Sequence, residues 1–403
     1  MIINPPEIRV KDGEVTVSSE IELQTSRKIA SRKLWYKFPE MYQEFLTDRV
    51  DGFVVALFVL AMLLGENVEV RGKLSPRLLD GIYEYQRVLH FWLPGRFKLV
   101  DITCEHYAPF DFQPAHRGVA SSFSGGLDSF YTLWCHLAQN ERISQFQVSH
   151  TLFVHGFDIP LQDEETYRVA FQSYQAMMQR LGIQLIAART NAREFDGGAW
   201  EYCHGAMLTS LPLVLGKGLT RYYIPSSHTY NDAYPWGSDH RIDHLLSAET
   251  LQVVHDGATA SRFEKTAAIA QWPEAYSRLR VCWQKPDGLK NCCRCNKCIR
   301  TMTSLAILDK LEQFETFPLK LEHQHIRNCP FKKENERSFM QQVLEAAELN
   351  DKQDLASDIR YALWRGKLDP WLSKLKPSSG KLRRGLAKGK RLVTSNLDSV
   401  KNW

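Results

Sequence analysis

The sequence predicts an α/β protein: a doubly wound parallel sheet with an N-terminal α+β domain and a C-terminal metal-bound helical region. Three observations predict this class. Short apolar strands alternate with helical stretches between residues 116 and 275, which is typical of a parallel sheet with helices on both faces. A glycine-rich hexapeptide at residues 124–129 follows the first of these strands directly. Four cysteines at residues 282–298 have the spacing of metal ligands.

Residues 1–115 are expected to form the α+β domain. Asp12-Gly13 is a hairpin turn signal, and Ser75-Pro76 is a typical helix start. The apolar run at 53–64 is shorter than the roughly 20 residues of a membrane span, so it predicts a buried helix. The expected elements are hairpin strands at 7–10 and 15–17, helices at 53–64 and 78–92, and strands at 68–70 and 97–102.

Residues 116–335 are expected to form a second domain that contains the parallel sheet, the hexapeptide and the four-cysteine site, and residues 336–403 a helical segment with a basic tail. Ligands of open parallel sheets bind at the carboxyl ends of the strands, where the hexapeptide lies. The expected strands are 119–123, 151–154, 184–187 and 222–224, and the clearest helices are 165–181 and 200–215.

The hexapeptide has the composition of a phosphate-binding turn. It reads Ser124, Gly125, Gly126, Leu127, Asp128 and Ser129. Two glycines let the backbone adopt positive φ and expose successive N–H groups, while the following helix N-terminus adds partial positive charge. No Walker A pattern is present. A glycine-rich turn that binds no ligand is the alternative interpretation.

Ser-Gly-Gly-x-Asp-Ser resembles the PP-loop of the ATP pyrophosphatase superfamily, whose members cleave ATP between the α and β phosphates. The resemblance implies a sheet of the HUP type, found in adenine nucleotide alpha hydrolase-like proteins, with ATP and Mg²⁺ at the loop. It makes Asp128 and Ser129 catalytic candidates. The segment 261–266 resembles a second family motif whose basic residue contacts pyrophosphate, so Arg262 and Lys265 are further candidates. An ordinary amphipathic helix start is the alternative for that segment.

Three other residues are candidate nucleotide contacts. Asp158 ends the second core strand, where the family binds adenosine, although an Asp before Ile159-Pro160 can simply shape a turn. Ser226 and Ser227 follow the strand at 222–224, which places them at the same crevice as the loop. Weaker acid–base or metal candidates are His240, Asp243, His255 and Asp256.

The cysteine cluster predicts a closed structural metal site. Cys282, Cys292, Cys295 and Cys298 form a C-x9-C-x2-C-x2-C pattern, with Cys293 as an extra thiol. Four thiolates around Zn²⁺ leave a net charge near −2. The cations close in sequence that can offset it are Lys290, Arg294, Lys297 and Arg300. An iron–sulfur cluster and unligated thiols are the alternatives.

Together, the loop and the cluster resemble 7-cyano-7-deazaguanine synthase-like proteins, which carry a PP-loop and a four-cysteine zinc site of this spacing. The resemblance covers roughly residues 116–305. Two departures indicate altered specificity: Cys293 stands where the family has glycine, and residues 232–238 differ from the family's substrate segment.

The resemblance implies an ATP-dependent ligase that adenylates a carboxylate or amide oxygen and releases pyrophosphate, after which ammonia or another nucleophile displaces AMP. The acceptor is a small molecule or a peptide, and a homodimer is a candidate assembly. The alternatives are an RNA-modifying PP-loop enzyme and a nucleotide-binding sensor or partner protein without turnover.

Charge is concentrated at one end of the chain. The net charge is +5, but residues 371–403 alone carry +8, which leaves −3 for the rest. RNA or an anionic surface is therefore a candidate partner for the tail only, and a solvated terminus is the alternative. No secretory signal or membrane span is visible, so a cytoplasmic location is expected.

Overall fold

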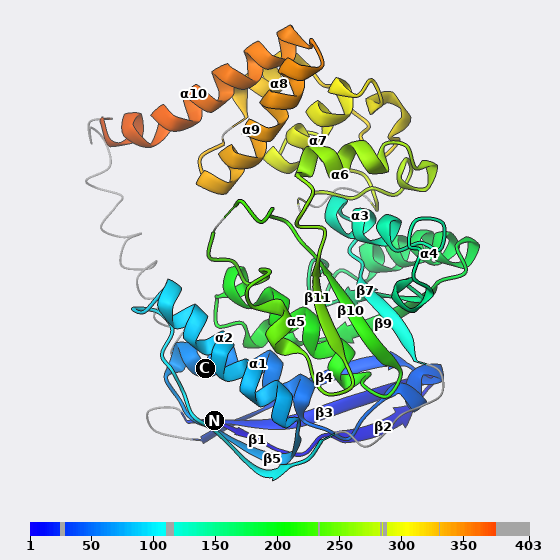
Figure 1. Cartoon of the computed structure of the whole chain (residues 1–403), viewed down its shortest axis with the longest axis vertical. Helices are drawn as coiled ribbons and strands as arrows, with labels where there is room; N and C mark the ends of the chain where they lie inside the picture. The colour runs from blue at the N-terminus through cyan, green and yellow to red at the C-terminus, as the bar shows by residue number, and fades with distance from the viewer. Residues whose placement is uncertain are drawn as a thin grey trace.

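The computed structural model describes residues 1–24, 29–109, 117–232, 234–282, 284, 288–329 and 331–375. It shows an α/β protein with an 11-stranded, mostly parallel mixed sheet and a C-terminal helical region (Figure 1). The strands are β1 (Ile2–Ile3), β2 (Glu7–Lys11), β3 (Glu14–Gln24), β4 (Ile29–Pro39), β5 (Val68–Leu74), β6 (Ile102–Tyr107), β7 (Gly118–Ser122), β8 (His150–His155), β9 (Gln184–Thr190), β10 (Leu219–Pro225) and β11 (Gln252–Asp256). The α-helices are α1 (Asp51–Leu64), α2 (Pro76–Trp92), α3 (Leu127–Cys135), α4 (Glu164–Arg180), α5 (Trp200–Val214), α6 (Arg262–Ile269), α7 (Asn296–Ile307), α8 (His323–Asn328), α9 (Glu334–Leu349) and α10 (Gln353–Leu375).

The parallel half of the sheet has the order β9-β8-β7-β10-β11. Counted along the chain this is 3-2-1-4-5, so β7 lies at the point where the winding reverses. Successive residues on each strand belong to different cores, because side chains alternate between the faces of a sheet. Val119, Phe153 and Tyr223 lie in one core, and Ala120, Leu152 and Tyr222 lie in the other. Both faces of this half are therefore covered.

The N-terminal strands continue the same sheet. β4 pairs antiparallel with β9 through Tyr36 and Lys37, and β3 pairs antiparallel with β1, β2 and β4. Helix α1 packs on α5 so closely that a Cβ at Gly52 would lie 2.5 Å from the backbone oxygen of Ser210. The domain boundary at residue 115 stays a prediction. Strands from both sides of this position belong to the same sheet.

Most elements predicted for the N-terminal region are confirmed. Asp12 and Gly13 form the hairpin turn with φ of 54° and 76°, and Ser75 caps α2 by accepting a hydrogen bond from Leu78 N at 3.0 Å. The strand predicted at 97–102 is wrong, because Phe97 N closes a turn onto the end of α2 and β6 begins only at Ile102.

The helices α6 to α10 gather beyond the carboxyl ends of β7, β10 and β11, on the side away from the N-terminal strands (Figure 1). α7, α8, α9 and α10 share a small apolar core of their own. None of the helices in the described ranges combines the length and apolar character that a membrane crossing requires. Of the basic tail, residues 376–403 lie outside the described residues, so its role stays a prediction.

Candidate functional site

The glycine-rich loop is a tight turn between β7 and α3, and it needs glycine at position 125. Gly125 has φ +75°, and a Cβ there would lie 1.8 Å from the hydroxyl oxygen of Tyr174 on α4. Gly126 is the N-cap residue of α3. The backbone N–H of Arg280 donates to the Gly125 carbonyl at 2.7 Å. The loop is therefore held from two sides in a conformation that other residues strain to adopt.

The hydroxyl groups of Ser124 and Ser129 form hydrogen bonds with backbone atoms of the loop. Ser129 Oγ donates to the Gly126 carbonyl at 2.9 Å and accepts from Ser124 N at 3.3 Å. Ser124 Oγ accepts from Gly126 N at 3.3 Å, and the Leu127 side chain is buried in the core. The free N–H groups of the first turn of α3 stand at the reversal point of the sheet, where an open α/β sheet binds its ligands. This geometry can hold an anion.

Asp128 joins the loop to α6 and to the segment after β10. Its Oδ2 accepts from Arg262 Nη1 at 2.7 Å and from Ser227 Oγ at 3.2 Å. Lys265 Nζ lies 3.7 Å from Asp128 Oδ1. Ser261 caps α6 through a capping box with Glu264. This cap fixes the first turn of the helix, which carries Arg262 and Lys265. Four predicted site residues from three separate segments of the sequence therefore lie together. They are Asp128, Ser227, Arg262 and Lys265.

Two cations surround one carboxylate at this point. Lys265 is 1% exposed, and its Nζ donates to Ser226 O at 2.7 Å and to Ser226 Oγ at 2.9 Å. Burial lowers the pKa of Lys265, and the charge of Asp128 opposes that shift. Burial alone would raise the pKa of Asp128, but the charges of Arg262 and Lys265 outweigh it and lower that pKa. Two basic side chains therefore face one carboxylate at this centre.

Asp158 lines a pocket of about 430 Å³ at the carboxyl ends of β8 and β9. The pocket is lined by Gly156, Phe157, Asp158, Pro160, Leu161, Gln162, Thr190, Asn191, Arg193, Glu194 and Trp200. A second hollow of about 580 Å³ lies between the segment after β10, the start of α6 and α9, with Thr229, Asp232, Ser261 and Gln342 among its lining residues. Neither hollow is lined by a residue of the loop.

The weaker acid–base candidates are tied into the fold. His255 Nδ1 lies 2.7 Å from Asp243 Oδ2, which also accepts from Ser238 Oγ at 2.6 Å. Asp256 accepts from Thr132 Oγ1 on α3 at 2.7 Å. His240 faces the neighbouring carboxylate of Asp239 at 3.5 Å. These contacts account for the side chains structurally.

Helix α9 supplies a part of the site that the sequence did not indicate. The Phe339 ring lies under two guanidinium groups, with its centroid 5.3 Å from Arg262 Cζ and 4.6 Å from Arg300 Cζ. Gln342 Oε1 accepts from Arg262 N at 3.3 Å. Nothing in the local sequence marks these positions, because α9 reads as an ordinary amphipathic helix more than 200 residues after the loop.

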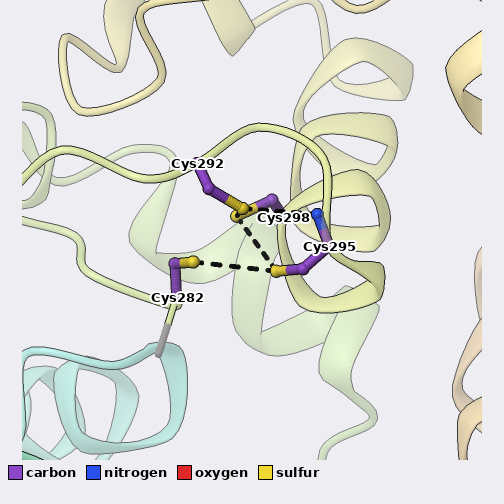
Figure 2. A group of neighbouring side chains, drawn as sticks. All are labelled: Cys282, Cys292, Cys295 and Cys298. Atoms are coloured by element: carbon purple, nitrogen blue, oxygen red, sulfur yellow. Dashed lines mark hydrogen bonds between the residues drawn. The ribbon is translucent and has the colours of Figure 1, made fainter. Parts of the chain in front are cut away.

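Figure 2 shows the four predicted cysteine ligands converging on one point. Their sulfur atoms all lie within 4.8 Å of one another. The closest pairs are Cys295 with Cys298 at 3.4 Å, Cys292 with Cys298 at 3.7 Å and Cys282 with Cys295 at 3.8 Å. A tetrahedral site with zinc–sulfur bonds of about 2.3 Å has sulfur separations of about 3.8 Å. The group can therefore hold a metal ion such as zinc.

Backbone N–H groups donate to two of these sulfurs, and the pKa shifts within the group run in opposite directions: burial raises the pKa of Cys282 to about 11, and the contact with Cys295 raises that of Cys298. Cys292 Sγ accepts from Cys295 N at 3.3 Å, and Cys282 Sγ accepts from Gln284 N at 3.3 Å. The hydrogen bond between Cys295 and Cys298 lowers the pKa of Cys295 to about 5. Backbone donors of this kind orient and stabilise ligand sulfurs.

Cys293 does not belong to the group. Its Sγ donates to Asn291 O at 3.4 Å, and its backbone lies in the left-handed region with φ 56°. A glycine would adopt that conformation without strain. This explains in physical terms why glycine suits the position in the family that the motif resembles.

No protein-family model, no curated protein and no solved structure matches this chain. The fold and the site therefore define the class by themselves. The chain is an α/β protein with a mostly parallel sheet, and its C-terminal helical region adjoins a four-cysteine group able to bind metal.

Proposed function

We propose that the protein is a PP-loop ATP pyrophosphatase of the HUP type that acts as an AMP- and pyrophosphate-forming ligase, related to the 7-cyano-7-deazaguanine synthase-like proteins. One observation carries the proposal. Asp128 in the loop meets Arg262 and Lys265, both from a segment more than 130 residues later, at the reversal point of the sheet. Packing alone does not call for a buried and a half-buried cation beside a glycine-rich turn.

The residues have distinct tasks in this reaction. The N–H groups of the loop and the cations Arg262 and Lys265 would stabilise the negative charge that develops on the departing pyrophosphate. Asp128 Oδ1 is buried and accepts no hydrogen bond from the described residues, so it is the atom through which Mg²⁺ or its water would be oriented. Mg²⁺ would neutralise phosphate charge. Ser124, Ser129 and Ser226 would keep the loop and Lys265 in place.

The products distinguish this proposal from γ-phosphoryl transfer. Incubation with ATP and a panel of carboxylate and amide acceptors, both small molecules and peptides, should yield AMP and pyrophosphate in equal amounts. Turnover should require the correct acceptor. ADP as the nucleotide product, or the absence of any nucleotide cleavage with acceptors that bind, would rule the ligase out.

For the cysteine group we propose a structural zinc ion held by Cys282, Cys292, Cys295 and Cys298. Elemental analysis of the purified protein should find one zinc per chain. Iron with visible absorbance near about 400 nm would establish the iron–sulfur alternative instead.

An RNA-modifying enzyme is the second candidate, favoured by the charge of +8 in residues 371–403. Its discriminating property is salt dependence, because phosphate contacts release counterions on binding. Affinity for RNA that falls steeply with salt and is lost on deletion of residues 377–403 would support it, and the absence of such binding would dismiss it.

A further inference from the structure

Arg300 is a buried cation with no hydrogen-bonded or ion-paired carboxylate among the described residues. It lies on α7, is 6% exposed, and its guanidinium contacts the Phe339 ring at 4.6 Å. Among the described residues no hydrogen bond or ion pair engages this guanidinium. Burying a charge without a partner is costly, so an arginine in this state needs a compensating ligand.

The carboxylates near Arg300 are already engaged. Glu336 on α9 accepts from Asn296 Nδ2 at 2.6 Å and from the backbone N–H groups of Lys332 and Lys333. Asp128 is bound by Arg262 and faced by Lys265. Asp128 and Glu336 therefore act on Arg300 only through longer-range attraction, and among the described residues neither carboxylate accepts a hydrogen bond from its guanidinium.

Two other arginines, Arg262 and Arg280, also have a side-chain N–H group without a hydrogen-bond partner among the described residues. The Nε atoms of Arg262 and Arg280 are buried and have no hydrogen-bond partner in the described part of the chain. Arg280 is 9% exposed, and its own backbone N–H donates to the Gly125 carbonyl. Arg262 and Arg300 therefore bring guanidinium N–H groups without a described partner close to the loop. Such an arrangement fits an oxyanion, which accepts many hydrogen bonds at once.

We propose that Arg300 and Arg262, held over the same Phe339 ring, form a subsite for an oxyanion beside the loop. A guanidinium stacked on an aromatic face keeps its N–H edge available for a planar, two-point contact with phosphate or carboxylate. If the proposed function holds, the oxyanion is either the terminal phosphate of ATP or an anionic group of the acceptor. The subsite itself requires no turnover.

Inorganic phosphate is the probe for this subsite. Calorimetric titration should show that Arg300→Gln weakens phosphate binding by about 10-fold or more, the loss expected for a charge-assisted contact. Arg221→Gln is the matched control, because Arg221 on β10 also stacks over an aromatic ring, at 4.3 Å from the Phe146 centroid, but lies near the amino end of its strand. This control should bind phosphate like the unmodified protein.

Two outcomes would overturn the proposal: no phosphate binding by the unmodified protein, or unchanged binding by Arg300→Gln. If that variant fails to fold, Arg300→Lys keeps the charge and removes the two-point contact. Phosphate binding by Arg300→Lys should then be measurably weaker, and equal affinity would overturn the proposal.

A competition experiment identifies the source of the oxyanion. If the subsite holds the terminal phosphate of ATP, saturating ATP should displace inorganic phosphate, and Arg300→Gln should weaken binding of ATP but not of AMP. If it holds an acceptor group, phosphate should bind together with ATP. Either result is independent of whether AMP and pyrophosphate are formed, so failure of the subsite and failure of the ligase are separable.

Discussion

At the scale of single residues, Asp128 decides the charge balance of the site. It is the only carboxylate in ion-pair contact with Arg262 and Lys265 in the described part of the chain, and Lys265 has almost no access to water. Removing one partner of a buried ion pair leaves the other charge without compensation. Asp128 therefore serves both the proposed chemistry and the stability of the fold.

Asp128→Asn should abolish pyrophosphate formation and lower the free energy of unfolding by about 2–4 kcal/mol at neutral pH. The folded pKa of Asp128 lies below its ordinary value of 3.8, so its contribution is present above that pH and is lost as the pH falls through the folded pKa. Denaturation curves of both proteins at pH 7 and near pH 3 test this. A stability gap that persists undiminished at low pH would refute the ion-pair explanation.

Gly125 is the residue at which loop geometry is most restrictive. Gly125→Ala should destabilise the protein by at least about 1–2 kcal/mol, because its φ is positive and its Cβ would overlap the Tyr174 hydroxyl. Gly182→Ala is a useful control: Gly182 also has positive φ, but a Cβ there meets nothing within 4 Å. The difference between the two variants in thermal unfolding measures the contact with Tyr174. Equal losses would show that only backbone strain matters.

At the scale of elements, α7 connects the cysteine group to the loop. Cys295 is the N-cap of α7 and Cys298 lies in its first turn, two residues before Arg300. A metal bound to these sulfurs would fix the start of the helix, and with it the position of that arginine. The metal would then support anion binding without taking part in chemistry.

Removal of the metal by a chelator should lower the melting temperature and weaken phosphate binding together. Cys295→Ser should have the same effect, whereas Cys293→Ser should retain one metal per chain because the Cys293 sulfur points to Asn291 O. Metal content, melting temperature and phosphate affinity are measured on all three proteins. Loss of metal from Cys293→Ser, or unchanged phosphate affinity in metal-free protein, would contradict this role of α7.

The sequence predicts individual elements better than their assembly. The loop, the cysteine group and the strands β7 to β10 follow from local patterns, since glycine, cysteine and apolar runs have local signatures. β11 (Gln252–Asp256) is not among the expected strands. β4 was missed because charged residues such as Arg32 and Lys33 interrupt its apolar pattern. Arg300 was assigned to the charge of the metal site, and only the position of α9 reveals that it faces Phe339. Contacts between distant segments leave no local pattern.

At the scale of the whole molecule, one sheet contains strands from residues 1–115 and from the domain predicted at residues 116–335. β4 supplies the neighbour of β9, and α1, with all its residues from 51 to 62 buried, packs on α5. A fragment without these elements would expose a strand edge and an apolar helix face, both of which promote aggregation.

The full chain should therefore unfold in one cooperative transition, in which residues 1–115 and the parallel half of the sheet unfold together. A fragment of residues 116–375 should be insoluble or should bind a hydrophobic dye, because β9 loses its partner strand and α5 loses α1. The control is deletion of residues 377–403, which should leave the transition unchanged since that segment lacks an apolar stripe. Calorimetry and circular dichroism follow the unfolding of both shortened chains. Two separate transitions, or a soluble fragment 116–375 that unfolds cooperatively, would instead establish residues 1–115 as an independent folding unit.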